Sequence, residues 1–138
     1  MASPAMSVVF ADAFYFLARL NRRDQHHERV VAFSRTFRAQ LLTSDWVLME
    51  VADALAKSEC RPRVRDFILH LRQSAACEIV PASRELLDRA LDLYHQHRDK
   101  EWTLTDCASF VVMRERSIAD GLTEDRHFEQ AGFKALFK

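Results

Sequence analysis

Hydrophobic and polar residues follow two alternating patterns along the chain. Short runs of β-branched and aromatic residues, typical of buried strands, are separated by longer segments whose apolar residues recur every three to four positions, as on one face of a helix. The short runs predict strands in SVVFAD (7–12), LLTS (41–44), CEIVPA (77–82), SIADGLT (117–123) and FKALF (133–137). The longer segments predict helices over residues 13–20, 24–41, 45–58, 61–74, 83–98, 105–116 and 125–132.

This alternation of strands and helices is typical of the α/β class. Strands separated by helices pair mostly in parallel through right-handed crossovers, which places helices on both faces of one sheet. No repeat, linker or low-complexity stretch interrupts the pattern, which therefore predicts a single domain over residues 1–138. Ligands of such folds bind beyond the carboxyl ends of the strands, so functional side chains are expected there.

Charge and cysteine content exclude several classes of protein. The 20 basic and 20 acidic side chains cancel, so binding of a nucleic acid would need a local basic patch or a bound cation. Cys60, Cys77 and Cys107 are odd in number and widely spaced, which argues against disulfides and a cysteine-rich zinc site and favours buried, reduced thiols.

No apolar run approaches the roughly 18 residues of a membrane span, and the N-terminus lacks the basic segment of a secretory signal. A soluble, cytoplasmic protein is expected.

Four carboxylates stand near positions where ligands of a parallel sheet are expected. Asp12 ends the first predicted strand, Asp106 opens the penultimate helix, and Asp125 follows the fourth predicted strand. Glu50 differs because it lies within a helix. Structural alternatives exist for each, since Asp12 and Asp125 can cap the helices that follow them. Thr103 and Asp106 have the spacing of a capping box, and Glu50 can face solvent.

Taken together, these carboxylates and their surroundings resemble the PIN domain, in particular the small toxin-type PIN proteins known as VapC. The likeness is carried by FADAFYFLARLNRRDQHH at the start, LLTSDWVLMEVADAL around Glu50, DKEWTLTDCASFVVMRE around Asp106 and GLTEDRHFEQAGF around Asp125, in the family's order and approximate spacing. The resemblance implies a three-layer α/β/α sandwich with a central five-stranded parallel sheet. It also implies that Asp12, Glu50, Asp106 and Asp125 converge at one edge of the sheet.

The sequence departs from the family at the first aspartate. Many relatives have a small hydroxyl residue directly after it, whereas Ala13 and Phe14 follow Asp12 here. The hydrogen bonding that supports Asp12 is therefore in question. Thr105 and Thr123 are candidates to support the aspartates or to contact a phosphate, with helix capping as an equal alternative.

Four carboxylates in one pocket repel each other unless a cation compensates them. Oxygen ligands, with no Cys or His expected nearby, favour Mg²⁺ or Mn²⁺ over zinc. We expect Asp12, Glu50 and Asp106 to provide most of the metal ligands and Asp125 to complete the site directly or through water. Such a metal can activate a water molecule against a phosphodiester and neutralise charge on the phosphate oxygens. All four carboxylates are thus predicted to be catalytic.

The resemblance implies a metal-dependent ribonuclease that hydrolyses RNA in a single-stranded or loop region and acts as the toxin of a toxin–antitoxin pair. It further implies a homodimer and a small antitoxin partner. The alternative is a noncatalytic module of the same fold that binds RNA or a partner protein. A nucleotide-binding domain is disfavoured because Gly121 and Gly132, the only two glycines, are not placed to hold phosphates.

Basic side chains and histidines are further candidates for functional groups. Two arginine clusters can steer RNA, with a solvated surface as the favoured alternative: Arg19, Arg22 and Arg23, and Arg61, Arg63 and Arg65. His26 and His27 stand early in an amphipathic helix and favour structural or surface roles. No histidine is assigned a catalytic role.

Overall fold

A parallel sheet of five strands runs through the protein in the order β3-β2-β1-β4-β5. The structure is a computed structural model and describes residues 7–57 and 59–138. The strands span Val8–Ala11 (β1), Gln40–Ser44 (β2), Cys77–Val80 (β3), Asp120–Leu122 (β4) and Lys134–Ala135 (β5). Every pairing between neighbouring strands is parallel. The predicted sheet is thereby confirmed.

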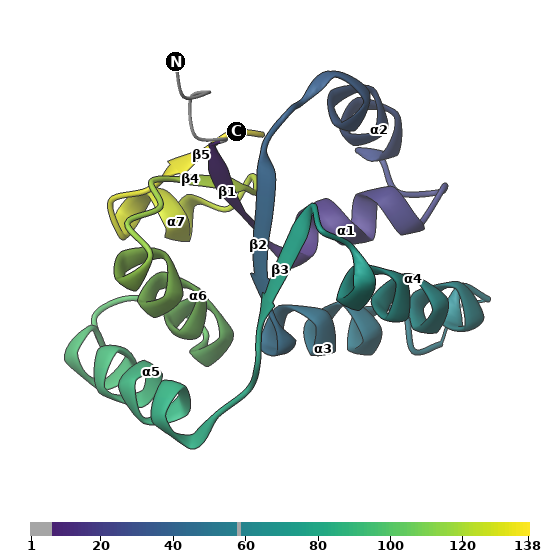
Figure 1. Cartoon of the computed structure of the whole chain (residues 1–138). Helices are drawn as coiled ribbons and strands as arrows, with labels where there is room; N and C mark the ends of the chain where they lie inside the picture. The colour runs from purple at the N-terminus through teal and green to yellow at the C-terminus, as the bar shows by residue number, and fades with distance from the viewer. Residues whose placement is uncertain (1–6, 58) are drawn as a thin grey trace, which may run out of the picture.

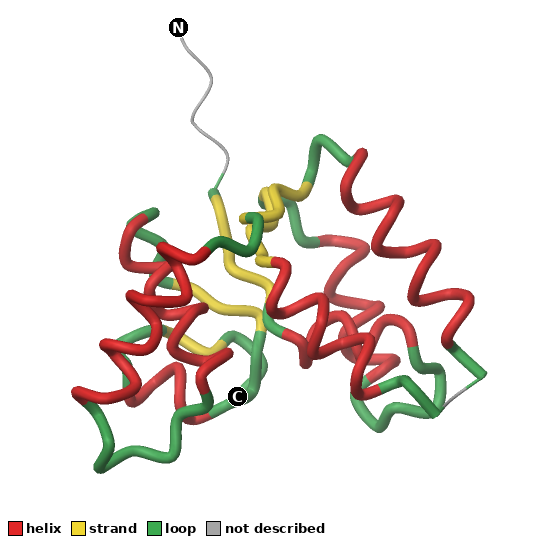
Figure 2. Tube along the Cα trace, turned by 90° about the horizontal axis from the view of Figure 1, so that it is seen from below, coloured by secondary structure: helices red, strands yellow, loops and turns green. Residues whose placement is uncertain are grey.

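Helices cover both faces of this sheet. They span Ala13–Leu20 (α1), His27–Thr36 (α2), Asp45–Ala54 (α3), Arg61–Gln73 (α4), Arg84–Gln96 (α5), Leu104–Glu115 (α6) and Arg126–Gln130 (α7). Figure 1 shows α1 to α4 on one side of the strands and α5 to α7 on the other. In the perpendicular view of Figure 2 the strands lie between these two groups. The predicted three-layer α/β/α sandwich is confirmed.

Several predicted helices are longer than the observed ones, and the difference is largest for α2. The helix predicted over 24–41 is α2, which ends at Thr36 because Phe37 takes an extended backbone. The apolar pattern continues past this point because Phe37 stacks on Phe33 and the following strand also turns side chains toward the core. Helix α3 ends at Ala54 within the predicted 45–58, and Ser58 lies outside the described residues.

Aromatic side chains fix the position of the last two helices against the sheet. Phe110 of α6 and Phe128 of α7 are fully buried and meet edge to face, with ring centroids 5.0 Å apart. Phe128 also lies beside Phe10 of β1, with ring centroids 6.5 Å apart. Such aromatic pairs contribute about 0.5–1.5 kcal/mol beyond the area they bury. These contacts pack α6 against α7 and hold α7 against β1.

The smaller predictions about buried side chains also hold. All three cysteines are buried. Phe14, Phe16 and Leu17 of α1 pack in or against the core. Within the described residues, no helix is long and apolar enough to cross a membrane.

Candidate functional site

The switch point of the sheet brings the first two candidate residues together. β1 lies between β2 and β4, and Ala11 at the end of β1 pairs with Leu122 at the end of β4. The next residues, Asp12 and Thr123, are therefore neighbours beyond the carboxyl ends of adjacent strands. The Thr123 hydroxyl donates a hydrogen bond to Asp12 Oδ2 over 2.9 Å, and both residues are buried.

Thr123 provides the hydroxyl that is missing directly after Asp12. Its Oγ1 supports Asp12 and also accepts the backbone N–H of Asp125 over 3.1 Å. One buried hydroxyl thus ties two of the predicted aspartates to each other. Asp12 stands at the N-cap of α1 without a capping hydrogen bond from its side chain, so the capping alternative does not account for it.

The structural roles predicted for Asp106 and Asp125 are both present. Asp106 Oδ2 accepts the N–H of Thr103 over 3.1 Å, and Thr103 Oγ1 accepts the N–H of Asp106 over 3.0 Å, which completes a capping box at the start of α6. Asp125 caps α7, because its Oδ1 accepts the N–H of His127 over 2.9 Å. Each cap uses one carboxylate oxygen. Among the described residues, the other oxygen of each receives no hydrogen bond.

Glu50 projects from α3 and is the most exposed of the four carboxylates. Its pKa is raised above its usual range, first by partial burial and then by the negative charges of Asp106 and Asp125, with a smaller effect from Asp53. Glu50 therefore shares the electrostatic environment of the aspartates. Its exposure agrees with the solvent-facing alternative, while the pKa of its carboxyl still responds to the charges of Asp106 and Asp125.

Burial makes the charge on Asp12 unfavourable. Its pKa rises from 3.8 to about 7 because the carboxyl is removed from water, and the charges of Glu50 and Asp106 raise it further. The Ala13 N–H and the Thr123 hydroxyl oppose this rise by hydrogen bonding the carboxylate. A nearby cation would remove the penalty, since opposite charge favours the ionised form. Carboxylate oxygens are ligands that suit a divalent cation. Asp12 and Glu50 do not belong to the closely spaced group of possible ligand atoms that the described residues form.

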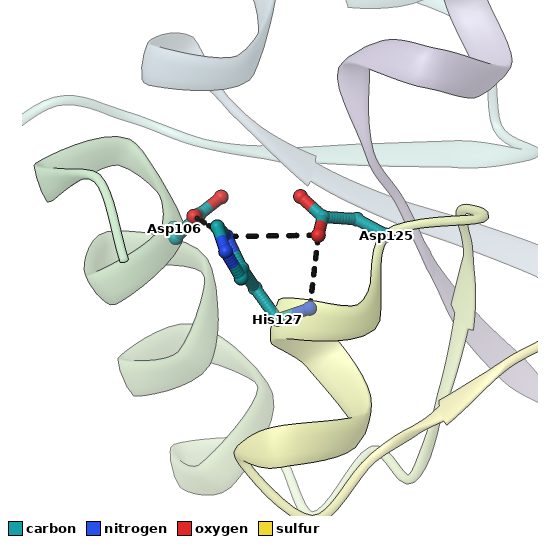
Figure 3. A group of neighbouring side chains, drawn as sticks. All are labelled: Asp106, Asp125 and His127. Carbon is teal, nitrogen blue, oxygen red and sulfur yellow. Dashed lines mark hydrogen bonds and ion pairs between the residues drawn. The ribbon is translucent and has the colours of Figure 1, made fainter. Parts of the chain in front are cut away.

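A histidine stands among these carboxylates, contrary to the expectation that none lies nearby. His127 Nδ1 is 3.0 Å from Asp106 Oδ2 and 3.6 Å from Asp125 Oδ1 (Figure 3). Within the part of the chain that the structure describes, these three residues form a group whose ligand atoms all lie within 4.8 Å of one another. The expectation of a site without histidine was wrong. His127 stands only two residues after Asp125 in sequence, but its contact with Asp106 depends on the packing of α6 against α7.

The remaining sequence candidates lie away from the carboxylates or serve the fold. Thr105 is half-buried in the first turn of α6, and no hydrogen bond of its side chain is described. His27 Nδ1 lies 2.6 Å from the carbonyl oxygen of Ala18, and His26 Nε2 lies 3.3 Å from Glu124 Oε2. These contacts agree with the structural roles expected of the two histidines.

The two arginine clusters meet along one surface pocket. This pocket, called the basic pocket below, is lined by Asn21, Arg22, Arg23, Lys57, Glu59, Cys60 and Arg63. Arg23 pairs with Glu59 at 3.5 Å, which leaves Arg22, Lys57 and Arg63 as its other cations. The other arginines are used differently: Arg19 stacks on Tyr15 and Phe67, Arg61 donates to the Ala56 carbonyl, and Arg65 pairs with Asp66.

Comparisons with known proteins agree on a family. The model of the PIN domain family matches residues 9–134. The 23S rRNA-specific endonuclease VapC20, found in two strains of Mycobacterium tuberculosis, is 25% identical over 126 residues, which is 91% of this chain and 95% of the relative.

Solved structures give the same picture. The crystal structure of M. tuberculosis VapC20, described as a sarcin–ricin loop cleaving toxin, matches with a TM-score of 0.81 at 25% identity, over 92% of this chain and 96% of that one. FitAcB from Neisseria gonorrhoeae matches with a TM-score of 0.60 at 18% identity, over 92% and 94% of the two chains. The second likeness shows a shared fold.

Proposed function

Since the chain belongs to the PIN domain family, we propose that it is a metal-dependent endoribonuclease and the toxin of a toxin–antitoxin pair. The observation that carries this proposal is the convergence of Asp12, Asp106 and Asp125 from the ends of three separate elements, linked through Thr123 and His127. The shared electrostatics of Glu50 adds the fourth carboxylate. Helix capping accounts for one oxygen each of Asp106 and Asp125, but not for the buried carboxyl of Asp12.

In this proposal Asp12, Glu50, Asp106 and Asp125 hold Mg²⁺ or Mn²⁺, the ions that carboxylate oxygens favour. When bound, such an ion supplies a water molecule of lowered pKa and stabilises negative charge that develops on a phosphate. The chain's own part is to hold the carboxylates in place. Thr123 restrains Asp12, and the caps of α6 and α7 restrain Asp106 and Asp125 through one oxygen each.

Glu50 marks the side of the cluster from which a substrate reaches it, because it is the exposed member. VapC20 is named an rRNA-specific endonuclease, which supports RNA as the substrate. Its crystal structure is described as that of a toxin that cleaves the sarcin–ricin loop, which supports cleavage in an unpaired region of RNA, where the backbone can bend into the site. The basic pocket supplies cations that can bind phosphates of an RNA substrate.

The proposal includes the partners that the resemblance implies. VapC20 is described as a toxin, which supports a cognate antitoxin for this chain. We also propose a homodimer, which light scattering during size-exclusion chromatography would detect, and a cytoplasmic location. Residues 1–138 act as one PIN domain in this proposal.

The deciding experiment compares Glu50→Gln with Asp53→Asn, two exposed acidic positions on the same helix. Each variant removes one negative charge from α3, but only Glu50 belongs to the proposed site. Purified proteins are incubated with labelled 23S ribosomal RNA and with a mixed RNA pool, in Mg²⁺, in Mn²⁺ and in EDTA. We expect wild type and Asp53→Asn to cut in either metal but not in EDTA, and Glu50→Gln to lose at least about a hundredfold in rate.

Two other outcomes would count against this function. If wild type binds RNA without cutting either substrate, the noncatalytic module is the better description. If cleavage persists undiminished in Glu50→Gln or in EDTA, the carboxylate cluster is not the nuclease site.

A further inference from the structure

His127 stands between two of the proposed metal ligands without having been one of the predicted site residues. Its ring nitrogen Nδ1 faces Asp106 Oδ2 at 3.0 Å and Asp125 Oδ1 at 3.6 Å, and its side chain is only 17% exposed. Figure 3 shows the imidazole between the two carboxylates, with the remaining oxygens of Asp106 and Asp125 on the same side of the ring.

The surroundings of Nδ1 determine its role in the hydrogen bond. Carboxylate oxygens only accept hydrogen bonds when ionised, so a nitrogen that faces two of them is favourable only if it carries the proton. Both the neutral ring protonated at Nδ1 and the imidazolium satisfy this condition. In either form, His127 Nδ1 donates to Asp106 Oδ2, the nearer oxygen.

Asp106 Oδ2 therefore receives two donors from different elements. The Thr103 N–H reaches it over 3.1 Å from the start of α6, and His127 Nδ1 reaches it over 3.0 Å from α7. Two donors on one oxygen restrain rotation of the carboxylate about its terminal bond. Within the described part of the chain, Asp106 Oδ1 has no donor, and it is this oxygen that is left for a cation.

We propose that His127 is a positioning residue that aims Asp106 Oδ1 at the metal by holding Asp106 Oδ2. This inference rests on the proposed function, because it assumes that the carboxylates bind a divalent metal. Groups that hydrogen-bond a metal ligand fix its orientation, and removing them typically weakens metal binding by about 10- to 100-fold. His127 acts in this way through Asp106 and does not itself bind the metal.

The test separates the hydrogen bond from the size of the side chain. In His127→Asn the amide nitrogen takes the position of Nδ1, one bond from Cγ, and can still donate to Asp106. His127→Leu has a similar volume and no donor. His95→Leu, at an exposed position on α5, controls for the loss of a histidine elsewhere. Thermal unfolding monitored by circular dichroism identifies variants that do not fold, and His127→Ala replaces Leu if Leu does not fold.

Binding of Mn²⁺ without RNA is measured by electron paramagnetic resonance and isothermal titration calorimetry. We expect His127→Leu to bind Mn²⁺ at least about tenfold more weakly than wild type, and His127→Asn and His95→Leu to stay within about threefold. Pulsed resonance of the wild-type complex should show no directly coordinated nitrogen. If His127→Leu and wild type bind Mn²⁺ with equal affinity, the positioning role is overturned. If a nitrogen atom coordinates Mn²⁺ in wild type, His127 binds the metal directly and the positioning role is likewise overturned.

Failure of the inference can be told apart from failure of the proposed function. If wild type binds Mn²⁺ but His127→Leu binds it equally well, only the role of His127 is lost, and the cleavage experiment still stands. If wild type binds neither Mn²⁺ nor Mg²⁺, the metal-dependent function fails and the positioning role fails with it.

Discussion

Replacing Asp12 by Asn should stabilise the metal-free protein at neutral and alkaline pH while removing metal binding. The pKa of Asp12 rises from 3.8 to about 7 on folding, so between these two pH values the folded chain holds more protons than the unfolded chain. The free energy of unfolding then falls as the pH rises through this window and stays low above it. Asn carries no charge at any pH, so its contribution to stability does not change in this way.

The magnitude follows from the difference between the two pKa values. Each pKa unit corresponds to about 1.4 kcal/mol, so ionising Asp12 in the fold costs on the order of 4 kcal/mol above pH 7. The amide that replaces it keeps an acceptor for Thr123 but brings two N–H donors into a buried site, which costs roughly 1–3 kcal/mol if they are left unpaired. We therefore expect the free energy of unfolding of Asp12→Asn to be about 1–3 kcal/mol higher than that of wild type at pH 8. At pH 4 the variant should be no more stable than wild type.

Urea unfolding, followed by tryptophan fluorescence and circular dichroism from pH 4 to pH 8 in EDTA, measures this difference. Only the difference between the two proteins is interpreted, because other groups titrate equally in both. Asp88→Asn, at an exposed position on α5, is the matched control and should track wild type at every pH. Mg²⁺ at one hundred times its dissociation constant should add about 2.7 kcal/mol to wild type and almost nothing to Asp12→Asn.

A difference that stays constant with pH would refute the reasoning, since it would mean that Asp12 does not carry the burial penalty. The same holds if Asp12→Asn is less stable than wild type at pH 8. In either case the cluster would not need a cation to relieve Asp12.

Two further predictions concern the support of the site and its surroundings. Thr123→Val removes the hydroxyl between Asp12 and Asp125, and we expect a loss of about 1–3 kcal/mol in unfolding free energy together with weaker Mn²⁺ binding, whereas Thr123→Ser should retain both. Urea unfolding and calorimetry would show this, and equal behaviour of Val and Ser would contradict it. Reversing the charge of Arg22 and Arg63 should weaken RNA binding. It should also reduce, by about 1–2, the steepness with which the logarithm of the binding constant falls with the logarithm of the salt concentration. Arg65→Glu, outside the basic pocket, is the control, and an unchanged slope in the double variant would exclude this pocket as an RNA contact.

The sequence determined the α/β order of elements and the places of the four carboxylates. Strand ends and helix starts can be located from local pattern, because hydrophobic periodicity and capping spacing are properties of a few consecutive residues. Asp12, Asp106 and Asp125 each lie at such a boundary, so their positions were predictable even though their convergence was only implied by the resemblance. The capping box of Thr103 and Asp106 was predictable for the same reason.

The end of α2 was predicted less well, because apolar spacing arises both from a helix face and from a buried strand. Phe37 continues the apolar spacing of α2, but it packs on Phe33 from an extended backbone and leads into β2. A buried strand and a buried helix face both require apolar side chains, so the period alone did not show where α2 ends.

Only the tertiary structure decided how the carboxylates are held. Thr123 meets Asp12 because β1 and β4 are adjacent in the sheet, although 111 positions separate the two residues in sequence. His127 meets Asp106 because Phe110 and Phe128 pack α6 against α7. A sequence pattern reports which face of an element is buried, whereas contacts between elements depend on which strands pair and how the helices pack on them. The carboxylates could therefore be found in the sequence, but the hydroxyl that supports Asp12 and the imidazole that holds Asp106 took their places only in the folded protein.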